Sequence, residues 1–284
     1  MATTHTTQVA AAIQTFWSPL FMDELRQQNL IVNLVNRDYE GAIEAEGDTV
    51  KITQVNKPTG QTLTRDGSGG DRTFTPAAMS LSSASVTANR RFVASFDIDE
   101  SAMQQSMVDP TGPKATEVRK ALVDSVSDQI NAYIFSLVSP TTTVASTATM
   151  TAAVVVAARE AAGTAKWGKS KPWYALMAPN YWADCLIDDK LTSGDFVDDK
   201  PVVGGQSGMK RFGFNMFEDD SMTNEALFFH PDFLHFVAQY QPRFKISDKH
   251  AQGEFAFVLS VDILGGASLG IAGAGKHYKV KVAA

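Results

Sequence analysis

The stretch TEVRKALVDSVSDQINAYIFSL, from Thr116 to Leu137, is the element around which we expect the rest of this chain to pack. Its apolar residues recur at spacings of three and four positions, which places them on one face of an α-helix. These residues are Val118, Leu122, Val126, Ile130, Ile134 and Leu137. The other face carries polar residues: Asp124, Ser127, Asp128 and Asn131. Pro113 and Pro140 flank the run, so the pattern predicts one amphipathic helix that ends near these prolines.

A helix of this length needs a large surface to pack against. At about 1.5 Å per residue it would be roughly 30 Å long, as long as a small domain is wide. Burying its apolar face would contribute on the order of 10 kcal/mol before conformational entropy is subtracted. We therefore expect this helix, called the spine helix below, to lie on a sheet or another domain. Many α+β domains contain such a core helix, so the rest of the chain is needed to decide which α+β fold this is.

The composition is that of an ordinary globular protein. The 284 residues are 44% hydrophobic and 20% charged, which suits one large domain or two modest ones. No apolar run reaches the roughly 20 residues of a membrane span, and the N-terminus lacks the pattern of an export signal. The net charge of −6 argues against a protein whose whole surface binds nucleic acid, but it is compatible with a mostly neutral wall that faces nucleic acid. The single cysteine, Cys185, excludes an internal disulfide and is expected to be a small buried residue.

A long polar segment precedes the spine helix. Residues 56–90 are punctuated by glycine, and their centre, Arg65 to Arg72, has almost nothing to bury. Strand-like sequences flank it: VKITQV at 50–55 and SVTANRRFVASFDIDE at 85–100. The pattern predicts a two-stranded hairpin that projects from the body. Because an isolated hairpin is marginally stable in water, we expect contacts outside its own chain to hold it.

The remaining sequence alternates between short helices and strands. Helices are expected within residues 16–34, from Met150 to Gly163 and over residues 180–187. The segment PWYALMAP, 172–179, predicts a buried strand, and KHYKVKVA, 276–283, predicts the last strand. The fold class is therefore α+β with a mostly antiparallel or mixed sheet.

One segment matches the pattern of a phosphate-binding loop. GTAKWGKS, Gly163 to Ser170, fits G-x-x-x-x-G-K-S, in which backbone N–H groups wrap phosphates, the lysine reaches the outer ones and the serine binds magnesium. That mechanism requires a strand before the loop and a helix after it. Here a helical pattern precedes the segment and a strand-like pattern follows it. A nucleotide-binding enzyme that uses this segment is kept only as an alternative.

Other candidate sites lack the spacing that their chemistry needs. His230 and His235 are separated by five positions, whereas helical zinc sites place two histidines four apart. Ser68 and Ser207 do not lie in a G-x-S-x-G elbow. The acidic residues between 188 and 199 show no calcium-loop spacing. We therefore expect no catalytic residue, no cofactor and no metal.

The segment FWSPLFMDELRQQNLIVNLVNRDYEGAIEAEGDTVKI, 16–52, resembles the N-terminal region of tailed-bacteriophage major capsid proteins. The order of elements continues the likeness: the polar loop at 56–90, the F-x-I-D-E segment from Phe96 to Glu100, the spine helix, and WYALMAPNYWADCLIDD at 173–189. The resemblance implies the Hong Kong 97 bacteriophage capsid fold, which encapsulins also use. In that fold an extended loop lies over the neighbouring subunit, which agrees with a hairpin that cannot bury itself.

The resemblance also implies a division of the chain into four parts. The expected parts are an N-terminal arm at 1–47, an extended loop at 48–95, a peripheral domain with the spine helix at 96–148 and 240–264, and an axial domain at 149–239 and 265–284. Charged residues are better placed to pair with a neighbouring subunit than to bind nucleic acid. Those expected at subunit contacts are Arg65, Asp66, Asp71, Arg72, Arg90, Arg91, Asp198, Asp199 and Lys249.

The function that the resemblance implies is structural rather than enzymatic. We expect a major capsid protein of a tailed double-stranded DNA bacteriophage, which assembles in the host bacterial cytoplasm into the hexamers and pentamers of the icosahedral head of the virion. Expected partners are further copies of the chain, scaffolding and portal proteins, optionally a cement protein, and the packaged DNA through weak non-specific contact, with no membrane. An encapsulin-like compartment shell is the alternative that shares the fold.

Overall fold

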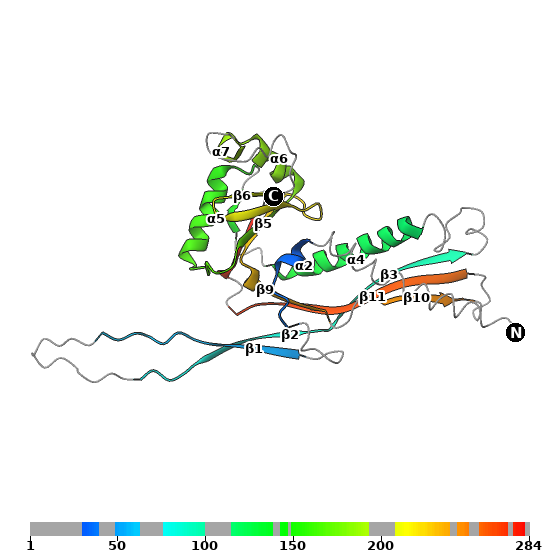
Figure 1. Ribbon diagram of the computed structural model, residues 1–284, viewed down its shortest axis with the longest axis horizontal. Coiled ribbons are helices and arrows are strands. Elements are labelled where there is room, and N and C mark those ends of the chain that lie inside the picture. The colour runs from blue at the N-terminus through cyan, green and yellow to red at the C-terminus, as the bar shows by residue number, and fades with distance from the viewer. Residues whose placement is uncertain are drawn as a thin grey trace, which may run out of the picture.

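The molecule is elongated, with a projecting hairpin, a long helix on a sheet, and a group of helices and strands above their junction (Figure 1). The computed structural model describes residues 30–39, 49–62, 76–99, 115–138, 143–146, 149–192, 208–238, 243–249, 256–271 and 275–281. The described strands form a two-stranded, a four-stranded and a six-stranded sheet. Together with the helices they give the α+β class that the sequence predicts.

The spine helix is α4, Ala115–Leu137, as the sequence predicts. It packs on an antiparallel sheet whose central strand is β11, Ala256–Leu269. The other strands of this sheet are β3, Arg90–Asp99; β9, Leu234–Ala238; and β10, Arg243–Asp248. The predicted apolar face is buried, since Val118, Leu122, Val126, Ile130 and Ile134 are each at most 9% exposed, and Leu137 at the end of the helix is half-buried. The apolar face of the helix and the facing side of the sheet therefore form one hydrophobic core.

The six-stranded sheet has the strand order β4-β12-β8-β5-β7-β6. Its strands are β4, Thr143–Ser146; β5, Trp173–Met177; β6, Gly208–Arg211; β7, Phe214–Glu218; β8, Glu225–Phe229; and β12, His277–Lys281. Two pairs are parallel, β5 with β7 and β12 with β4, and the other pairs are antiparallel. The accompanying helices are α5, Ala152–Thr164; α6, Pro179–Ile187; and α7, Asp189–Thr192.

Strand β5 is buried on both faces, which explains its continuous apolar sequence. Ala175 and Met177 belong to a cluster that includes Val155 of α5 and Trp182 of α6. Leu176, which alternates with them along the strand, belongs instead to the cluster around α4. The strand thereby joins the six-stranded sheet to the spine-helix layer.

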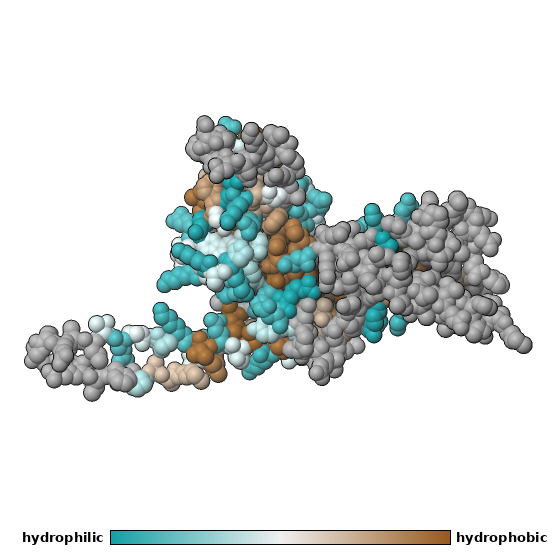
Figure 2. Space-filling view, in the orientation of Figure 1, coloured by the Kyte–Doolittle hydropathy of each residue, from teal (hydrophilic) through white to brown (hydrophobic). Residues whose placement is uncertain are grey.

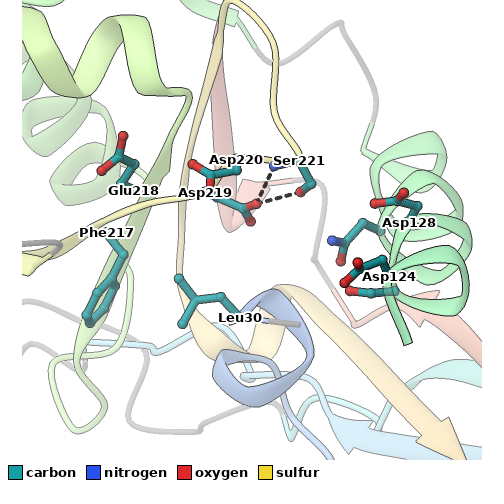
Figure 3. Close-up of a pocket in the computed structure, with 10 residues that line it drawn as sticks. Leu30, Asp124, Asp128, Phe217, Glu218, Asp219, Asp220 and Ser221 are labelled. Carbon is teal, nitrogen blue, oxygen red and sulfur yellow. Dashed lines mark hydrogen bonds between the residues drawn. The ribbon is translucent and has the colours of Figure 1, made fainter. Parts of the chain in front are cut away.

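The polar face predicted for the spine helix is partly wrong. Asp124 and Asp128 are exposed, but Ser127 and Asn131 are each only 4% exposed. Both residues line a cavity together with Leu30 of helix α2, Leu30–Leu34, and the turn between β7 and β8, so this side of the spine helix also faces other parts of the chain (Figure 3). Periodicity predicts one buried face, and it does not reveal this second contact.

The predicted hairpin is formed by β1, Thr49–Val55, and β2, Leu81–Thr87, which pair antiparallel along their whole length. Its second flank is not a single strand, as the sequence interpretation had it. Ala88 and Asn89 separate β2 from β3, and β3 pairs with β11 in the spine-helix sheet. Ala88 is completely buried at this bend, so the chain passes from the exposed hairpin directly into the core.

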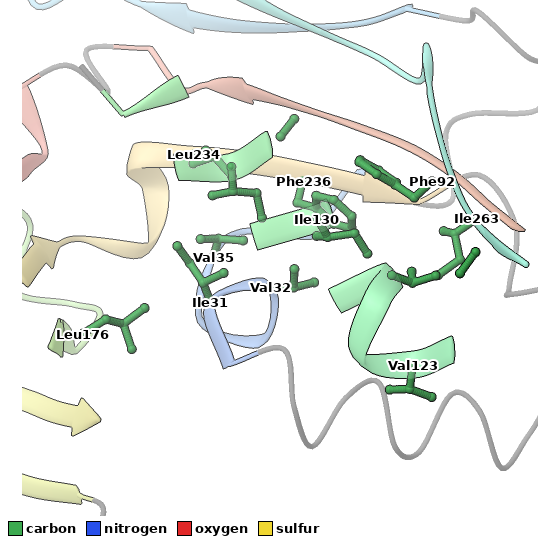
Figure 4. Packing of buried hydrophobic residues seen from close by; sticks show 14 of the residues in the cluster. Ile31, Val32, Val35, Phe92, Val123, Ile130, Leu176, Leu234, Phe236 and Ile263 are labelled. Atoms are coloured by element: carbon green, nitrogen blue, oxygen red, sulfur yellow. The ribbon is translucent and has the colours of Figure 1, made fainter. Parts of the chain in front are cut away.

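The first described segment, residues 30–39, packs against the spine-helix sheet. Of the helix expected within residues 16–34, only α2 lies within the described residues, and its Ile31 and Val32 pack with Leu234 and Phe236 of β9 (Figure 4). The short 3-10 helix η2, Pro231–Phe233, leads into β9. Strand β9 pairs with residues 265–269 of β11, and both segments lie in the expected axial domain, 149–239 and 265–284. The expected four-part division of the chain stays a prediction.

Candidate interaction surface

The hairpin carries exposed apolar side chains on both of its strands. Val55 is 59% exposed, Leu81 is 57% exposed, and Met79, just before β2, is 74% exposed. Val55 and Leu81 lie opposite each other across the two strands. Figure 2 shows brown and tan surface along this projecting part of the molecule. We call Val55, Met79 and Leu81 the hairpin patch.

The root of the hairpin, in contrast, is held by its own chain. Ile52 of β1 and Val86 of β2 are buried in a small cluster with Val237 of β9. Gly266 of β11 lies directly against β2, since a Cβ at this position would be 2.0 Å from the carbonyl oxygen of Thr87. Only a residue without a side chain allows this approach. The hairpin is therefore anchored at its root and exposed beyond it.

A polar cavity of about 350 Å³ lies beside this root, with Gln54 of β1 in its wall. Within it, Lys171 Nζ donates a hydrogen bond to Asp232 Oδ1 at 2.8 Å, and Asn36 Nδ2 donates to the same oxygen at 3.3 Å. Burial alone would raise the pKa of Asp232, but these two hydrogen bonds lower it below its ordinary value. The same hydrogen bond has the opposite effect on its donor, because it raises the pKa of Lys171. The pair is thus charged at neutral pH.

Two histidines lie beside this pair. The Asp232 backbone N–H donates to His230 Nδ1 at 3.2 Å, and burial lowers the pKa of His230 and of His235. His230 Nε2 and His235 Nδ1 have no hydrogen-bond partner among the described residues. No group of three or more His, Cys, Asp or Glu in the described part of the chain is arranged to hold a metal ion. The histidines are therefore neutral groups of the core.

Three of the charged residues expected at subunit contacts lie in the described part of the chain, and each has a partner in its own subunit. Arg91 donates from Nε and Nη2 to Asp262 Oδ2 at 2.9 and 2.6 Å. Arg90 lies over the ring of Tyr133, at 5.3 Å from its centroid. Lys249 forms an ion pair with Asp97. The other expected residues lie outside the described part: Arg65, Asp66, Asp71, Arg72, Asp198 and Asp199. Contacts of these residues between subunits stay a prediction.

The sequence interpretation selected charged residues and missed the hairpin patch. A signal was available, because Val55, Met79 and Leu81 flank a long segment that has no core of its own. Apolar residues in such a segment have nothing to pack against within the chain, so their exposure could have been inferred. Isolated surface ion pairs, in contrast, contribute little free energy.

The phosphate-loop pattern lies in the wrong structural context for phosphate binding. Gly163 is in the last turn of α5, and the segment ends at Ser170 just before β5. Trp167 within it is buried, and its Nε1 donates to the carbonyl oxygen of Gly275 at 2.8 Å. Strand β5, and not a helix, is the element that follows the segment, so its backbone N–H groups lack the helix dipole that binds phosphates. This order of helix, loop and strand is the one that the sequence predicts.

Solved structures with the same arrangement identify the fold. A structure from Mycobacterium phage Che8 matches with a TM-score of 0.70 and 17% identity, covering 89% of this chain and 91% of that chain. The capsid of cyanophage P-SCSP1u matches with a TM-score of 0.63 and 12% identity, covering 88% and 86%. This chain has the Hong Kong 97 bacteriophage capsid fold. The mature capsid of bacteriophage PhiM1 also has it, with a TM-score of 0.60, 12% identity and coverage of 84% and 83%.

The Hong Kong 97 fold confirms the resemblance that the sequence showed. No family model matches the sequence, and no curated protein matches it. The likeness therefore lies in the order and packing of elements, from the hairpin through the spine helix to the six-stranded sheet. At identities of 12 to 17%, the likeness to these structures shows the fold alone.

Proposed function

We propose that this chain is the major capsid protein of a tailed double-stranded DNA bacteriophage. The hairpin patch carries the proposal: Val55, Met79 and Leu81 are more than half exposed on a ribbon that projects from the body. A two-stranded ribbon is marginal in water, and apolar residues on it favour coverage by another protein surface. A second copy of the chain is the partner that a repeating shell supplies. The fold, shared with phage capsid structures, supports the same function.

The proposed assembly consists of hexamers and pentamers that close into the icosahedral head of a virion in the host bacterial cytoplasm. A hairpin that docks on a different surface of the next copy makes a heterologous contact, and such contacts close into rings when the rotation allows. The net charge of −6 suits a container in which packaged DNA makes only weak contacts. Scaffolding and portal proteins, optionally with a cement protein, complete the proposed partners. Among the described helices, none has the length and apolar character that crossing a membrane requires.

The two alternatives receive less support. An encapsulin-like compartment shell would share the fold and the projecting hairpin, but the similar capsid structures named above come from phages. A cargo protein enclosed in the purified shell would favour the compartment. A nucleotide-binding enzyme would depend on Gly163 to Ser170, and that segment lacks the helix that phosphate binding needs.

Replacing Leu81 tests the role of the hairpin patch. Leu81→Asp places a charge on the exposed patch, so the subunit should stay folded while the yield of shells falls at least about tenfold, as a loss of ~1.4 kcal/mol in one contact would cause. Leu81→Met keeps an apolar side chain and is the matched control, with shells at the wild-type yield. Shell yield is measured by sedimentation and electron microscopy, and subunit folding by thermal melting. Wild-type shell yield from Leu81→Asp would contradict the proposal.

A further inference from the structure

The polar cavity beside the hairpin root is walled by segments that are far apart in the chain. Strand β1 contributes Ile52, Thr53 and Gln54, and strand β9 contributes His235. The other walls come from η2 and from segments next to α2, β5, β11 and β12, and their residues are Asn36, Tyr39, Lys171, Asp232, Ile271 and Lys276. The cavity therefore lies between the hairpin and the body of the subunit.

His235 is the buried imidazole of this cavity. It is only 6% exposed, its backbone forms a bridge with Asn36, and its ring meets that of Tyr39 edge-on, with 5.4 Å between the ring centroids. Its Nδ1 atom is closed off from solvent and has no hydrogen-bond partner among the described residues. A protonated imidazole donates from both ring nitrogens, so the charged form needs an acceptor at Nδ1. A buried donor without an acceptor destabilises the fold around it.

Burial is the main obstacle to a proton on His235, and the surrounding charges do not remove it. Asp232 and Asp38 favour a positive charge on the ring, whereas Lys276 and Lys171 oppose it, so two acids and two bases balance. Asp232 is moreover already engaged, since Lys171 donates to it at 2.8 Å. The residues that β1 contributes to the wall carry no charge. Water is therefore the group that can solvate a protonated His235.

Strand β1 is the wall of the cavity that yields most easily to water. Among the described strands it pairs with β2 alone, whereas β9 pairs with the central strand β11. Ile52 is buried in the small cluster with Val237 of β9, but the cavity residues Thr53 and Gln54 are exposed. Separation of β1 from β9 would thus admit water to His235 without breaking a sheet of the body.

We propose that His235 is a proton-sensitive switch for the root of the hairpin. While the imidazole is neutral, β1 closes the cavity and Ile52 stays against β9. When the imidazole takes up a proton, water enters to solvate it and the β1 root separates from the body. Burial lowers the pKa of His235 in the closed form. The closed root is therefore favoured above a pH of about 6.5 and loses stability as the pH falls through the lowered pKa.

Hydrogen exchange of the full-length subunit, followed by mass spectrometry at pH 7.5 and 5.5, tests this switch. Rates are corrected for the pH dependence of intrinsic exchange. A separated root loses protection because an isolated hairpin is marginal, so the protection of β1 relative to α4 should fall at least about threefold at pH 5.5. His235→Gln has no titrating ring, and its ratio should be equal at the two pH values. His235→Asn, which also lacks the ring, is measured beside it and should behave alike.

The matched control is His230→Gln. His230 is also buried and burial also lowers its pKa, but it is not among the residues that line the cavity. Its variant should keep the wild-type fall in the protection of β1, even if its Tm is lower. A constant ratio in the wild type, the full fall in both His235 variants, or loss of the fall in His230→Gln would each overturn the proposal. The measurement uses unassembled subunits, so its outcome does not depend on the proposed capsid function.

Discussion

Gly266 of β11 and Thr87 of β2 approach so closely that a Cβ on Gly266 would lie 2.0 Å from the Thr87 carbonyl oxygen. This contact joins the root of the projecting hairpin to the central strand of the spine-helix sheet. The buried cluster of Ile52, Val86, Ala88 and Val237 lies at the same root. The direction in which the hairpin leaves the body therefore depends on a position where no side chain fits.

Substitution of Gly266 by alanine is expected to destabilise the subunit. The added methyl group must displace backbone, which costs on the order of 3 kcal/mol and lowers the Tm by about 5–10 °C. Gly163→Ala is the matched control, because a Cβ on Gly163 meets no atom within 4 Å and the residue lies in helix α5, where alanine is favoured. Its Tm should be unchanged or slightly raised. If the two variants have the same Tm, the close approach of Gly266 to the Thr87 carbonyl oxygen is contradicted.

The subunit is expected to lose stability as the pH falls from about 7.5 to 5. Burial lowers the pKa of His230 and of His235, so the folded chain binds fewer protons than the unfolded chain in this range. Their contribution is fully present above the unfolded pKa of about 6.5 and is lost as the pH falls through the folded pKa. Asp232, whose pKa is also lowered, adds a loss of the same sign at more acidic pH. Thermal melting across this range measures the slope.

The double variant His230→Leu, His235→Leu provides the check on this assignment. It should melt with a smaller dependence on pH than the wild type between pH 7.5 and 5, while Gly163→Ala keeps the wild-type dependence. Lys171 does not contribute in this range, because its raised pKa places its loss of stability at alkaline pH. If the Tm of the double variant depends on pH as strongly as that of the wild type, groups other than His230 and His235 cause the loss of stability.

The thiol of Cys185 is expected to be unreactive in the folded subunit. Cys185 is completely buried, its Sγ donates to Met177 Sδ at 3.7 Å, and burial raises its pKa to about 12. At pH 8 the thiolate fraction is then on the order of 10⁻⁴, which leaves no nucleophile for a disulfide reagent. Titration with Ellman's reagent should detect no thiol in native protein and one per chain in guanidinium chloride. Rapid labelling of the native protein would contradict this placement.

The sequence predicted the elements of the fold better than their contacts. The spacing of Leu122, Val126 and Ile130 was sufficient for the spine helix, because a periodic apolar face has few alternatives. The cavity beside Ser127 and Asn131 could not be predicted, since a turn about 90 positions later in the chain forms part of its wall. The bend at Ala88 was missed for a similar reason: alternation continues through it, and only pairing with β11 separates the two strands.

The sequence predicted the hairpin that carries the candidate interaction surface, but not that apolar side chains form this surface. A segment without a core of its own indicated a projecting hairpin, and the structure contains it. The exposure of Val55, Met79 and Leu81 could have been inferred from the same segment, because apolar residues that flank a stretch without a core have nothing to pack against within the chain. The cavity beside His235 was not foreseen at all, since its walls come from segments far apart in the sequence.

Imaging the purified chain shows whether it assembles into a capsid. The chain is expressed with and without its candidate scaffolding partner, and negative-stain electron microscopy is combined with a light-scattering mass. Closed shells or rings of five and six subunits are expected in at least one of the two preparations. A folded monomer with no larger species in both preparations would contradict the proposed capsid function.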